Sequence, residues 1–149
     1  MTKAFQIMHN MMVAHALAVL EYKKAGYNGK IGVVQSLEYK YPFDENNLDD
    51  IQAAKNEDVL QNQFLLDATF KGYYSTETME IVNRLVSINN GTLELLDEDF
   101  DVLKQAALLN DYMGMNYYQS RFIQHYEGEN DIHHNGTGEK GTSRFCLKN

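Results

Sequence analysis

Stretches of mainly apolar residues alternate along the chain with short polar segments that contain glycine, asparagine or proline. The longest apolar stretch follows Thr2, a good helix cap, and ends with two lysines and Gly26, as helices commonly do. The shorter stretch Ile31–Leu37 contains two valines and is therefore predicted to be a strand buried on both faces. In full, the pattern predicts helices over residues 2–24, 49–70, 75–89 and 97–109, strands over residues 31–37 and 112–118, a loop over residues 39–47, an exposed loop over residues 127–143, and a last short strand over residues 144–148.

The order of these elements favours an α/β fold in which crossover helices join parallel strands. Only two strands give a strong signal, and strands buried on both faces need neighbouring strands to form a stable sheet. The 149 residues are also too few for a complete (β/α)8 barrel, which typically has about 250 residues and rarely fewer than about 200. We therefore expect residues 1–149 to form a single segment of a larger fold and not a complete domain.

The charge balance argues against a nucleic-acid partner. The chain has 13 lysines and arginines against 21 aspartates and glutamates, for a net charge of −8, and nothing basic is clustered as in a protein that binds the phosphate backbone. The single cysteine, Cys146, cannot form an internal disulfide, and no signal-peptide pattern is present at the start of the sequence. Both observations favour the cytoplasm.

The apolar run Ala4–Leu20 raises the question of a membrane helix. A spanning helix needs about 20 predominantly apolar residues. Four polar residues interrupt this run: Gln6, His9, Asn10 and His15. A helix that is apolar nearly all round is more simply explained as one buried in a large protein, so no membrane partner is expected.

Metal and cofactor sites find little support in the residue spacing. His125, His133 and His134 lie near acidic residues, but without the spacing of zinc sites, and are predicted to lie on a solvated loop. His9 and His15 are six residues apart, on different helix faces, and are expected to be separate interior histidines. The segment 136–142 lacks the spacing of a phosphate-binding loop. We predict neither a metal nor a cofactor.

An acidic cluster before and within the helix over residues 97–109 has a structural explanation. Acidic residues in the first turn interact favourably with the helix dipole, so the cluster needs no metal to account for it. Its members are Glu94, Asp97, Glu98, Asp99 and Asp101.

The segment Asn116-Tyr117-Tyr118 is the most informative candidate site. It lies at the carboxyl end of a predicted parallel strand, where α/β folds place their chemistry. Alternation along the strand sends Asn116 and Tyr118 to one face and Tyr117 to the other. From the residues alone, both a site and simple packing remain open.

Several stretches, taken together, carry a family resemblance over nearly the whole chain: His9–Ala16, Gly32–Val34, Tyr39–Asp44, Phe64–Tyr74, Gly114–Tyr118 and His134–Gly141. In this order they resemble glycoside hydrolase family 1, and specifically its 6-phospho-β-galactosidase branch. The Gly-Glu-Lys-Gly sequence at residues 138–141 favours that branch over the 6-phospho-β-glucosidases.

The resemblance implies a (β/α)8 barrel, of which this chain would cover the fourth helix through the sixth strand and the following loop. Retaining hydrolysis in the family needs two glutamates with carboxyl groups about 5–5.5 Å apart. The acid/base motif of the family would precede this chain and the nucleophile motif would follow it, so we expect no catalytic residue here and no activity of the chain alone. Asn116 and Tyr118 match family positions on the sixth strand, where they would bind substrate or orient the nucleophile through the tyrosine hydroxyl.

The resemblance further implies an enzyme of lactose catabolism in the cytoplasm. Its full-length form would bind a phosphorylated disaccharide and release galactose 6-phosphate and an aglycone sugar. Two alternatives remain: a segment of a 6-phospho-β-glucosidase, or a non-catalytic fragment that self-associates through its apolar helix and unpaired strand edges.

Overall fold

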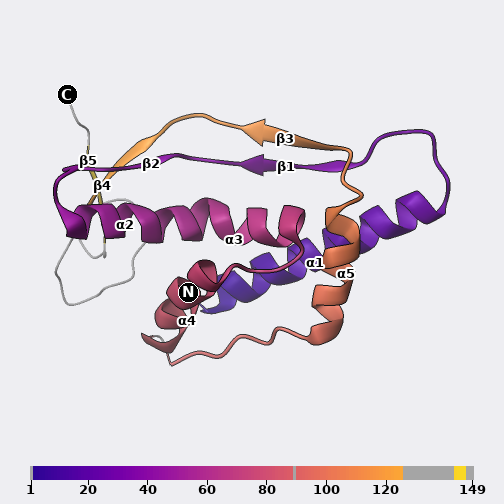
Figure 1. Cartoon of the computed structure of the whole chain (residues 1–149), viewed down its shortest axis with the longest axis horizontal. Helices are drawn as coiled ribbons and strands as arrows, with labels where there is room; N and C mark the ends of the chain where they lie inside the picture. The colour runs from indigo at the N-terminus through magenta and orange to yellow at the C-terminus, as the bar shows by residue number, and fades with distance from the viewer. Residues whose placement is uncertain (1, 89, 126–142, 147–149) are drawn as a thin grey trace. The chain divides into compact units, whose positions relative to one another are not determined.

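The computed structural model describes residues 2–88, 90–125 and 143–146 (Figure 1). The chain divides into two compact units. The first unit consists of Met1–Ser36 and Gln63–Asn116, and the second of Leu37–Asn62 and Tyr117–Asn149.

A two-stranded parallel sheet and several helices make up the first unit. Strand β1 (Gly32–Ser36) pairs with β3 (Tyr112–Asn116), and the register runs from Gly32 opposite Tyr112 to Ser36 opposite Asn116. The two strands run side by side in the same direction in Figure 1. The helical elements of this unit are α1 (Thr2–Lys24), α3 (Phe64–Leu66), the π-helical turn η2 (Asp67–Lys71), α4 (Thr76–Ile88) and α5 (Asp97–Ala107).

The core of the first unit is built on aromatic and branched side chains. Phe5 and Phe64 are fully buried and meet edge to face with ring centroids 5.1 Å apart. The Phe64 ring also stacks on Tyr74 at 4.3 Å and 8°. Such contacts fasten α1 to the segment around residues 64–74, because each aromatic ring removes a large apolar area from water.

Specific polar residues set the helix boundaries of this unit. The hydroxyl of Ser75 accepts a hydrogen bond from the backbone N–H of Thr78 at 3.2 Å, which caps α4 as predicted. The Asp99 carboxylate accepts the backbone N–H of Leu96 at 3.3 Å at the start of α5. Gly72, with φ +74°, ends η2 in the left-handed conformation that glycine adopts without strain.

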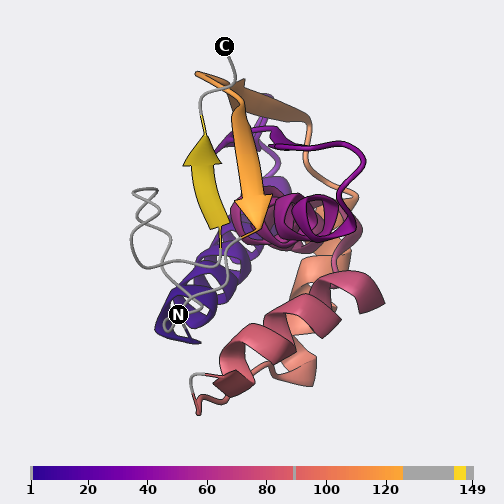
Figure 2. The same cartoon turned by 90° about the vertical axis from the view of Figure 1, so that its left-hand side faces the viewer.

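The second unit packs a helix against a small mixed sheet. Strand β2 (Lys40–Pro42) is parallel to β4 (Arg121–His125), which is antiparallel to β5 (Ser143–Cys146). Figure 2 shows β4 and β5 running in opposite directions. Helix α2 (Leu48–Asp58) continues into the π-helical turn η1 (Val59–Gln63) and contributes Ala53 and Ala54 to a core around the fully buried Ile123.

Asp50 of α2 joins the helix to the strands of this unit. Its carboxylate accepts the backbone N–H of His125 at 2.7 Å and that of Asp44 at 3.0 Å. The side chain is 2% exposed, so these bonds are needed to offset the loss of water around the carboxylate.

Several predictions about secondary structure are wrong. Residues 39–47, predicted to be a loop, contain β2, and residues 121–125, for which no element was predicted, form β4. Strand β1 is not buried on both faces, since Val34 is 59% exposed. The predicted helix over residues 49–70 is interrupted by η1 and η2, where Asn62 and Asp67 turn toward partners outside the helix.

Other predictions are confirmed. Helix α1 has the predicted bounds, and β1 and β3 lie within the predicted strands. The last strand is β5, one residue earlier than predicted, while Leu147 and Lys148 lie outside the described residues. The loop predicted over residues 127–143 also lies outside them, except for Ser143.

Among the helices of the described ranges, α1 included, none combines the length and apolar character needed to cross a membrane.

Candidate functional site

The carboxyl ends of β1 and β3 bring Ser36 and Asn116 together as register partners. Side chains alternate between the two faces of a strand, so these two share a face with Val34 and Gly114. Ser36 and Asn116 are exposed, whereas Gln35, on the opposite face of β1, is 4% exposed. The predicted residue Asn116 therefore lies at an accessible strand end.

Buried polar contacts hold the opposite face of this sheet against the helices. The Gln35 amide donates to the Thr69 hydroxyl at 2.9 Å, and that hydroxyl lies 2.7 Å from the carbonyl oxygen of Leu65. Asn110, just before β3, donates its amide to the Thr69 carbonyl at 3.2 Å and accepts a hydrogen bond from His15 Nε2 at 2.9 Å. These contacts hold the Gln35 face of β1 against the helices, whereas Met113 and Met115 on the same face of β3 are 44% and 57% exposed.

A charged contact fixes the amino ends of the same two strands. Lys23 Nζ lies 2.6 and 2.7 Å from the two carboxylate oxygens of Asp111, and the backbone N–H of Ile31 donates to Asp111 at 2.8 Å. These hydrogen bonds, that from Lys23 above all, hold the pKa of Asp111 below its usual value of 3.8. Asp111 therefore remains ionised near neutral pH.

Tyr118, the second predicted site residue, belongs to the second unit and is 82% exposed. Its neighbours in the chain are tied to the segment before β2: the Gln119 amide donates to Glu38 at 2.9 Å, and the backbone N–H of Arg121 donates to the carbonyl oxygen of Tyr39 at 2.9 Å. The structure thus places Tyr118 on a held segment with its ring open to solvent.

Glu38 is the centre of an ionic cluster in this unit. Its carboxylate is paired with Lys40, with Gln119 and, at 2.8 Å, with Arg121 Nε. Burial favours a higher pKa for Glu38, but the hydrogen bonds from Lys40, Gln119 and Arg121 outweigh it and lower the pKa below its usual value of 4.5. This cluster was not predicted from the sequence. The alternation Tyr39-Lys40-Tyr41 could have indicated a strand in which Lys40 lies on one face and the two tyrosines on the other.

The described histidines occupy ordinary structural positions. His9 is fully buried, with Nδ1 2.9 Å from the Tyr74 hydroxyl and Nε2 3.2 Å from the Asp99 carboxylate, which agrees with the prediction of a satisfied interior histidine. His125 is described, whereas His133 and His134 lie outside the described residues. Within the described ranges, no three histidine, cysteine or acidic residues come together as a metal site.

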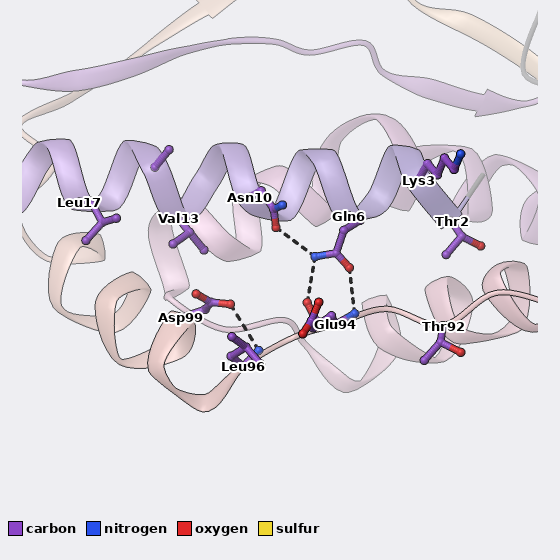
Figure 3. Close-up of a pocket in the computed structure, with 11 residues that line it drawn as sticks. Thr2, Lys3, Gln6, Asn10, Val13, Leu17, Thr92, Glu94, Leu96 and Asp99 are labelled. Atoms are coloured by element: carbon purple, nitrogen blue, oxygen red, sulfur yellow. Dashed lines mark hydrogen bonds between the residues drawn. The ribbon is translucent and has the colours of Figure 1, made fainter.

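A pocket of about 650 Å³ lies between α1 and residues 92–99 of the first unit (Figure 3). The Gln6 side chain crosses its floor, donating to the carbonyl oxygen of Glu94 at 2.9 Å and accepting its backbone N–H at 2.8 Å. The Asp99 carboxylate, also in the wall, is engaged by Leu96 and His9. These polar groups hold residues 92–96 against α1, a structural role that the acidic composition did not reveal.

The sequence model of glycosyl hydrolase family 1 matches residues 1–146. Three similar solved structures are the psychrophilic β-glucosidase BglU from Micrococcus antarcticus (24% identity, TM-score 0.71, covering 85% of this chain and 25% of that chain), a β-glucosidase from Exiguobacterium marinum (24%, 0.72, 87% and 28%) and the family 1 β-glucosidase from Thermotoga maritima (23%, 0.68, 97% and 28%).

The chain spans about a quarter of the length of these structures. At this level of identity the likeness concerns the fold, and the fold is that of the (β/α)8 barrel, of which the described helices and short strands form a part. The predicted fold class, a partial (β/α)8 barrel of α/β type, is confirmed. Because the family match extends over residues 1–146, this chain belongs to glycosyl hydrolase family 1.

Proposed function

We propose that this chain supplies part of the substrate-binding end of a retaining 6-phospho-β-galactosidase that acts in lactose catabolism in the cytoplasm. The observation that carries the proposal is the open face at the carboxyl ends of β1 and β3, where Ser36 and Asn116 lie side by side. In (β/α)8 barrels this end of the sheet carries the active site. Membership of glycosyl hydrolase family 1 supplies the reaction class.

In this proposal the chain binds and orients, while the catalytic carboxylates come from elsewhere. Retaining hydrolysis uses an acid/base and a nucleophile about 5–5.5 Å apart. The Asn116 amide would donate a hydrogen bond to a hydroxyl of the sugar. The Tyr118 hydroxyl would donate to the nucleophile carboxylate, and a donor on the charged form keeps the nucleophile ionised.

The phosphorylated galactoside is supported by sequence alone, through Gly138–Gly141. Two other substrates compete with it: a 6-phospho-β-glucoside, and an unphosphorylated β-glucoside, which the names of the similar structures favour. The family and the fold are common to all three, so the substrate has to be decided by measurement.

The test compares chromogenic 6-phospho-β-galactoside, 6-phospho-β-glucoside and β-glucoside substrates. We expect the purified chain to hydrolyse none of them above a blank. Co-expressed with the preceding and following parts of a family 6-phospho-β-galactosidase, the chain should restore turnover. Where the reading frame continues beyond either end, the longer product should prefer the phosphogalactoside. Turnover by the chain alone would refute the proposal that the catalytic carboxylates come from elsewhere. Preference for a glucoside would refute the proposal of a phosphogalactoside substrate.

Asn116→Ala tests the site itself in the complemented enzyme. Loss of one hydrogen bond to a sugar hydroxyl should lower kcat/KM about tenfold or more. Asn83→Ala, an exposed asparagine on α4, is the matched control and should leave activity unchanged. Equal activities of the two variants would show that Asn116 does not bind the substrate.

We also propose that the chain without further protein associates with itself. In the first unit, Ile7, Met11 and Leu17 of α1 are 58%, 57% and 48% exposed, and exposed apolar faces of this kind favour association. Size-exclusion chromatography with light scattering should give a mass above that of one chain, falling on dilution. A monomer at every concentration would contradict the proposal.

A further inference from the structure

Two Asn-Gly pairs in the first unit share a sequence but differ in their backbone surroundings. Asn28-Gly29 lies in the connection between α1 and β1 (Figure 1), and Asn90-Gly91 follows α4. In such a pair the backbone nitrogen of the glycine can attack the side-chain amide of the asparagine, because glycine has no side chain in the way and adopts a wide range of backbone angles. The reaction requires that this nitrogen be free to move.

The pair Asn90-Gly91 is locked by the end of α4. The N–H of Gly91 donates to the carbonyl oxygen of Val86 at 3.0 Å, and the N–H of Asn90 donates to that of Ser87 at 2.9 Å. Asn90 has φ +50°, the left-handed conformation. Together these features form a Schellman motif. The nitrogen that would attack is therefore engaged, and both hydrogen bonds have to open before it can react.

The pair Asn28-Gly29 is not held in this way. The last backbone bond at the end of α1 runs from the N–H of Gly26 to Lys23 at 3.1 Å, and the next along the chain is the bond from the N–H of Ile31 to Asp111. In the part of the chain that the structure describes, neither Asn28 nor Gly29 has a hydrogen bond between these two points. Both residues are exposed, so water reaches the pair.

We propose that Asn28 is a site of spontaneous deamidation in the folded chain and that Asn90 is protected from it. The Gly29 nitrogen gives its proton to water and forms a bond to the side-chain carbonyl carbon of Asn28. The C–N bond of the amide breaks, and the nitrogen leaves as ammonia. Water then opens the five-membered succinimide ring at either carbonyl, which leaves aspartate or isoaspartate at position 28.

In total the modification consumes one water and releases one ammonia. It involves two adjacent residues of one unit, so it is independent of the proposed function. The product adds one negative charge to the net charge of −8, two residues before the exposed Lys30. In the isoaspartate form the backbone also gains a methylene group, close to the N–H of Ile31 that Asp111 holds. The modification thus changes both the charge and the path of the connection into β1.

The test compares deamidation rates in the folded and the unfolded chain. The purified chain is kept at mildly alkaline pH in native buffer and in urea, with circular dichroism to verify each state, and peptide mapping by mass spectrometry follows both pairs. In urea the pairs should react at similar rates. In native buffer Asn28 should stay within about threefold of its rate in urea, whereas Asn90 should slow about tenfold or more, because its hydrogen bonds have to open first.

Two results would overturn the proposal. Equal rates at Asn28 and Asn90 in the native chain would show that the Schellman motif gives no protection. A tenfold or greater slowing of Asn28 on folding would show that its turn does not allow the attack. Isoaspartate at position 28 identifies the route, since direct hydrolysis of the amide gives aspartate alone.

Substitutions provide a second, independent readout by ion-exchange chromatography of the native chain. Asn28→Gln should remove most of the acidic species, because the longer side chain would have to close a larger ring, whereas the matched control Asn90→Gln should leave that species unchanged. The reverse pattern would contradict the proposal. The change is made at the asparagine because a Cβ on Gly29 would lie 2.2 Å from the Tyr22 hydroxyl. Both variants and their parent carry Asn135→Gln, since the third Asn-Gly pair lies outside the described residues.

Discussion

Lys23, in the last turn of α1, holds Asp111, the residue before β3, through contacts of 2.6 and 2.7 Å to both carboxylate oxygens. Because Asp111 also accepts the N–H of Ile31, one carboxylate joins the end of a helix to the amino ends of both strands in the first unit. The carboxyl ends of these strands carry the open face with Ser36 and Asn116, so this contact supports the candidate site from the opposite end.

Asp111→Asn tests the charge in this contact while keeping an acceptor for Ile31. The folded state holds the Asp111 pKa below 3.8, mainly through Lys23. For a carboxyl with a lowered pKa, the stabilisation is complete above the unfolded pKa and is lost as the pH falls through the folded one. We therefore expect the variant to unfold at lower urea concentration, by an amount constant between about pH 5 and 8 and shrinking below pH 3.8.

The matched control is Glu21→Gln. Glu21 pairs with Lys24 one turn along the same helix, but both side chains are more than 70% exposed, at 72% and 76%. Pairs this exposed contribute little, so the control should unfold with the parent chain. An equal loss of stability in both variants would show that the Lys23–Asp111 contact contributes no more to stability than the exposed Glu21–Lys24 pair.

Alanine substitutions at Gly72 and Gly26 distinguish two destabilising effects of a side chain: the strain of a left-handed backbone and a steric clash with a neighbouring helix. Both have positive φ, +74° and +70°, but a Cβ on Gly72 would lie 2.5 Å from Lys104 Cα, whereas a Cβ on Gly26 would meet nothing within 4 Å. We expect Gly26→Ala to cost about 1–2 kcal/mol for the backbone conformation alone. Gly72→Ala should cost about 1–3 kcal/mol more, because α5 has to move.

Urea unfolding of both glycine variants, followed by circular dichroism, gives the two free energies of unfolding. Equal losses would show that the close approach between Gly72 and α5 is absent in solution.

The buried pair His9 and Tyr74 is suited to a double-mutant cycle. His9 Nδ1 lies 2.9 Å from the Tyr74 hydroxyl and Nε2 lies 3.2 Å from the Asp99 carboxylate; in the neutral tautomer with the proton on Nε2, Nδ1 accepts from Tyr74. Burial, with Asp67 and Asp99 nearby, raises the Tyr74 pKa, which keeps the hydroxyl protonated as a donor. Tyr74→Phe should cost about 1–3 kcal/mol, since it leaves the buried nitrogen unpaired.

In the cycle, the same change made on a His9→Phe background should cost less by about 1 kcal/mol. Tyr73→Phe, at a tyrosine that is 51% exposed, provides the control and should be near neutral. Additive losses in the cycle would contradict the hydrogen bond.

The sequence predicted best where local signals and the fold agree. Helix α1 begins at Thr2 and ends at Lys24 with two lysines in its last turn, and Gly26 follows with a positive φ. These signals depend on a few neighbouring residues, although among the described residues the Thr2 hydroxyl has no hydrogen-bond partner and so does not act as the predicted cap. Ser75 and Gly72 also mark their boundaries correctly. Periodicity cannot report a change in helix geometry, so the π-helical turns, which let Asn62 and Asp67 reach partners elsewhere in the chain, were not predictable.

Strands β2 and β4 were missed for a different reason. They are short, contain polar residues and Pro42, and are stabilised by pairing with each other across 80 residues of chain, as in Tyr41 opposite Phe122. The same non-local pairing stacks Tyr41 on Phe122 and brings Arg121 to Glu38. Asn116 could be identified from its place at a strand end, but its partner Ser36 depends on the register of β1 and β3, which pattern alone does not fix.

Tyr118→Phe tests the proposed role of Tyr118 as a positioning residue in the complemented enzyme. Removing the hydroxyl takes a hydrogen bond from the nucleophile carboxylate, so kcat should fall by about 10²-fold. The pKa of the nucleophile should rise, because a donor to the charged form has been lost. The acidic limb of the kcat/KM profile should therefore move to higher pH, a change that a purely structural role for Tyr118 would not produce. Tyr27→Phe, at another exposed tyrosine, should leave both kcat and the profile unchanged. A tenfold or smaller fall in kcat with an unmoved limb would mean that Tyr118 only packs at the strand end.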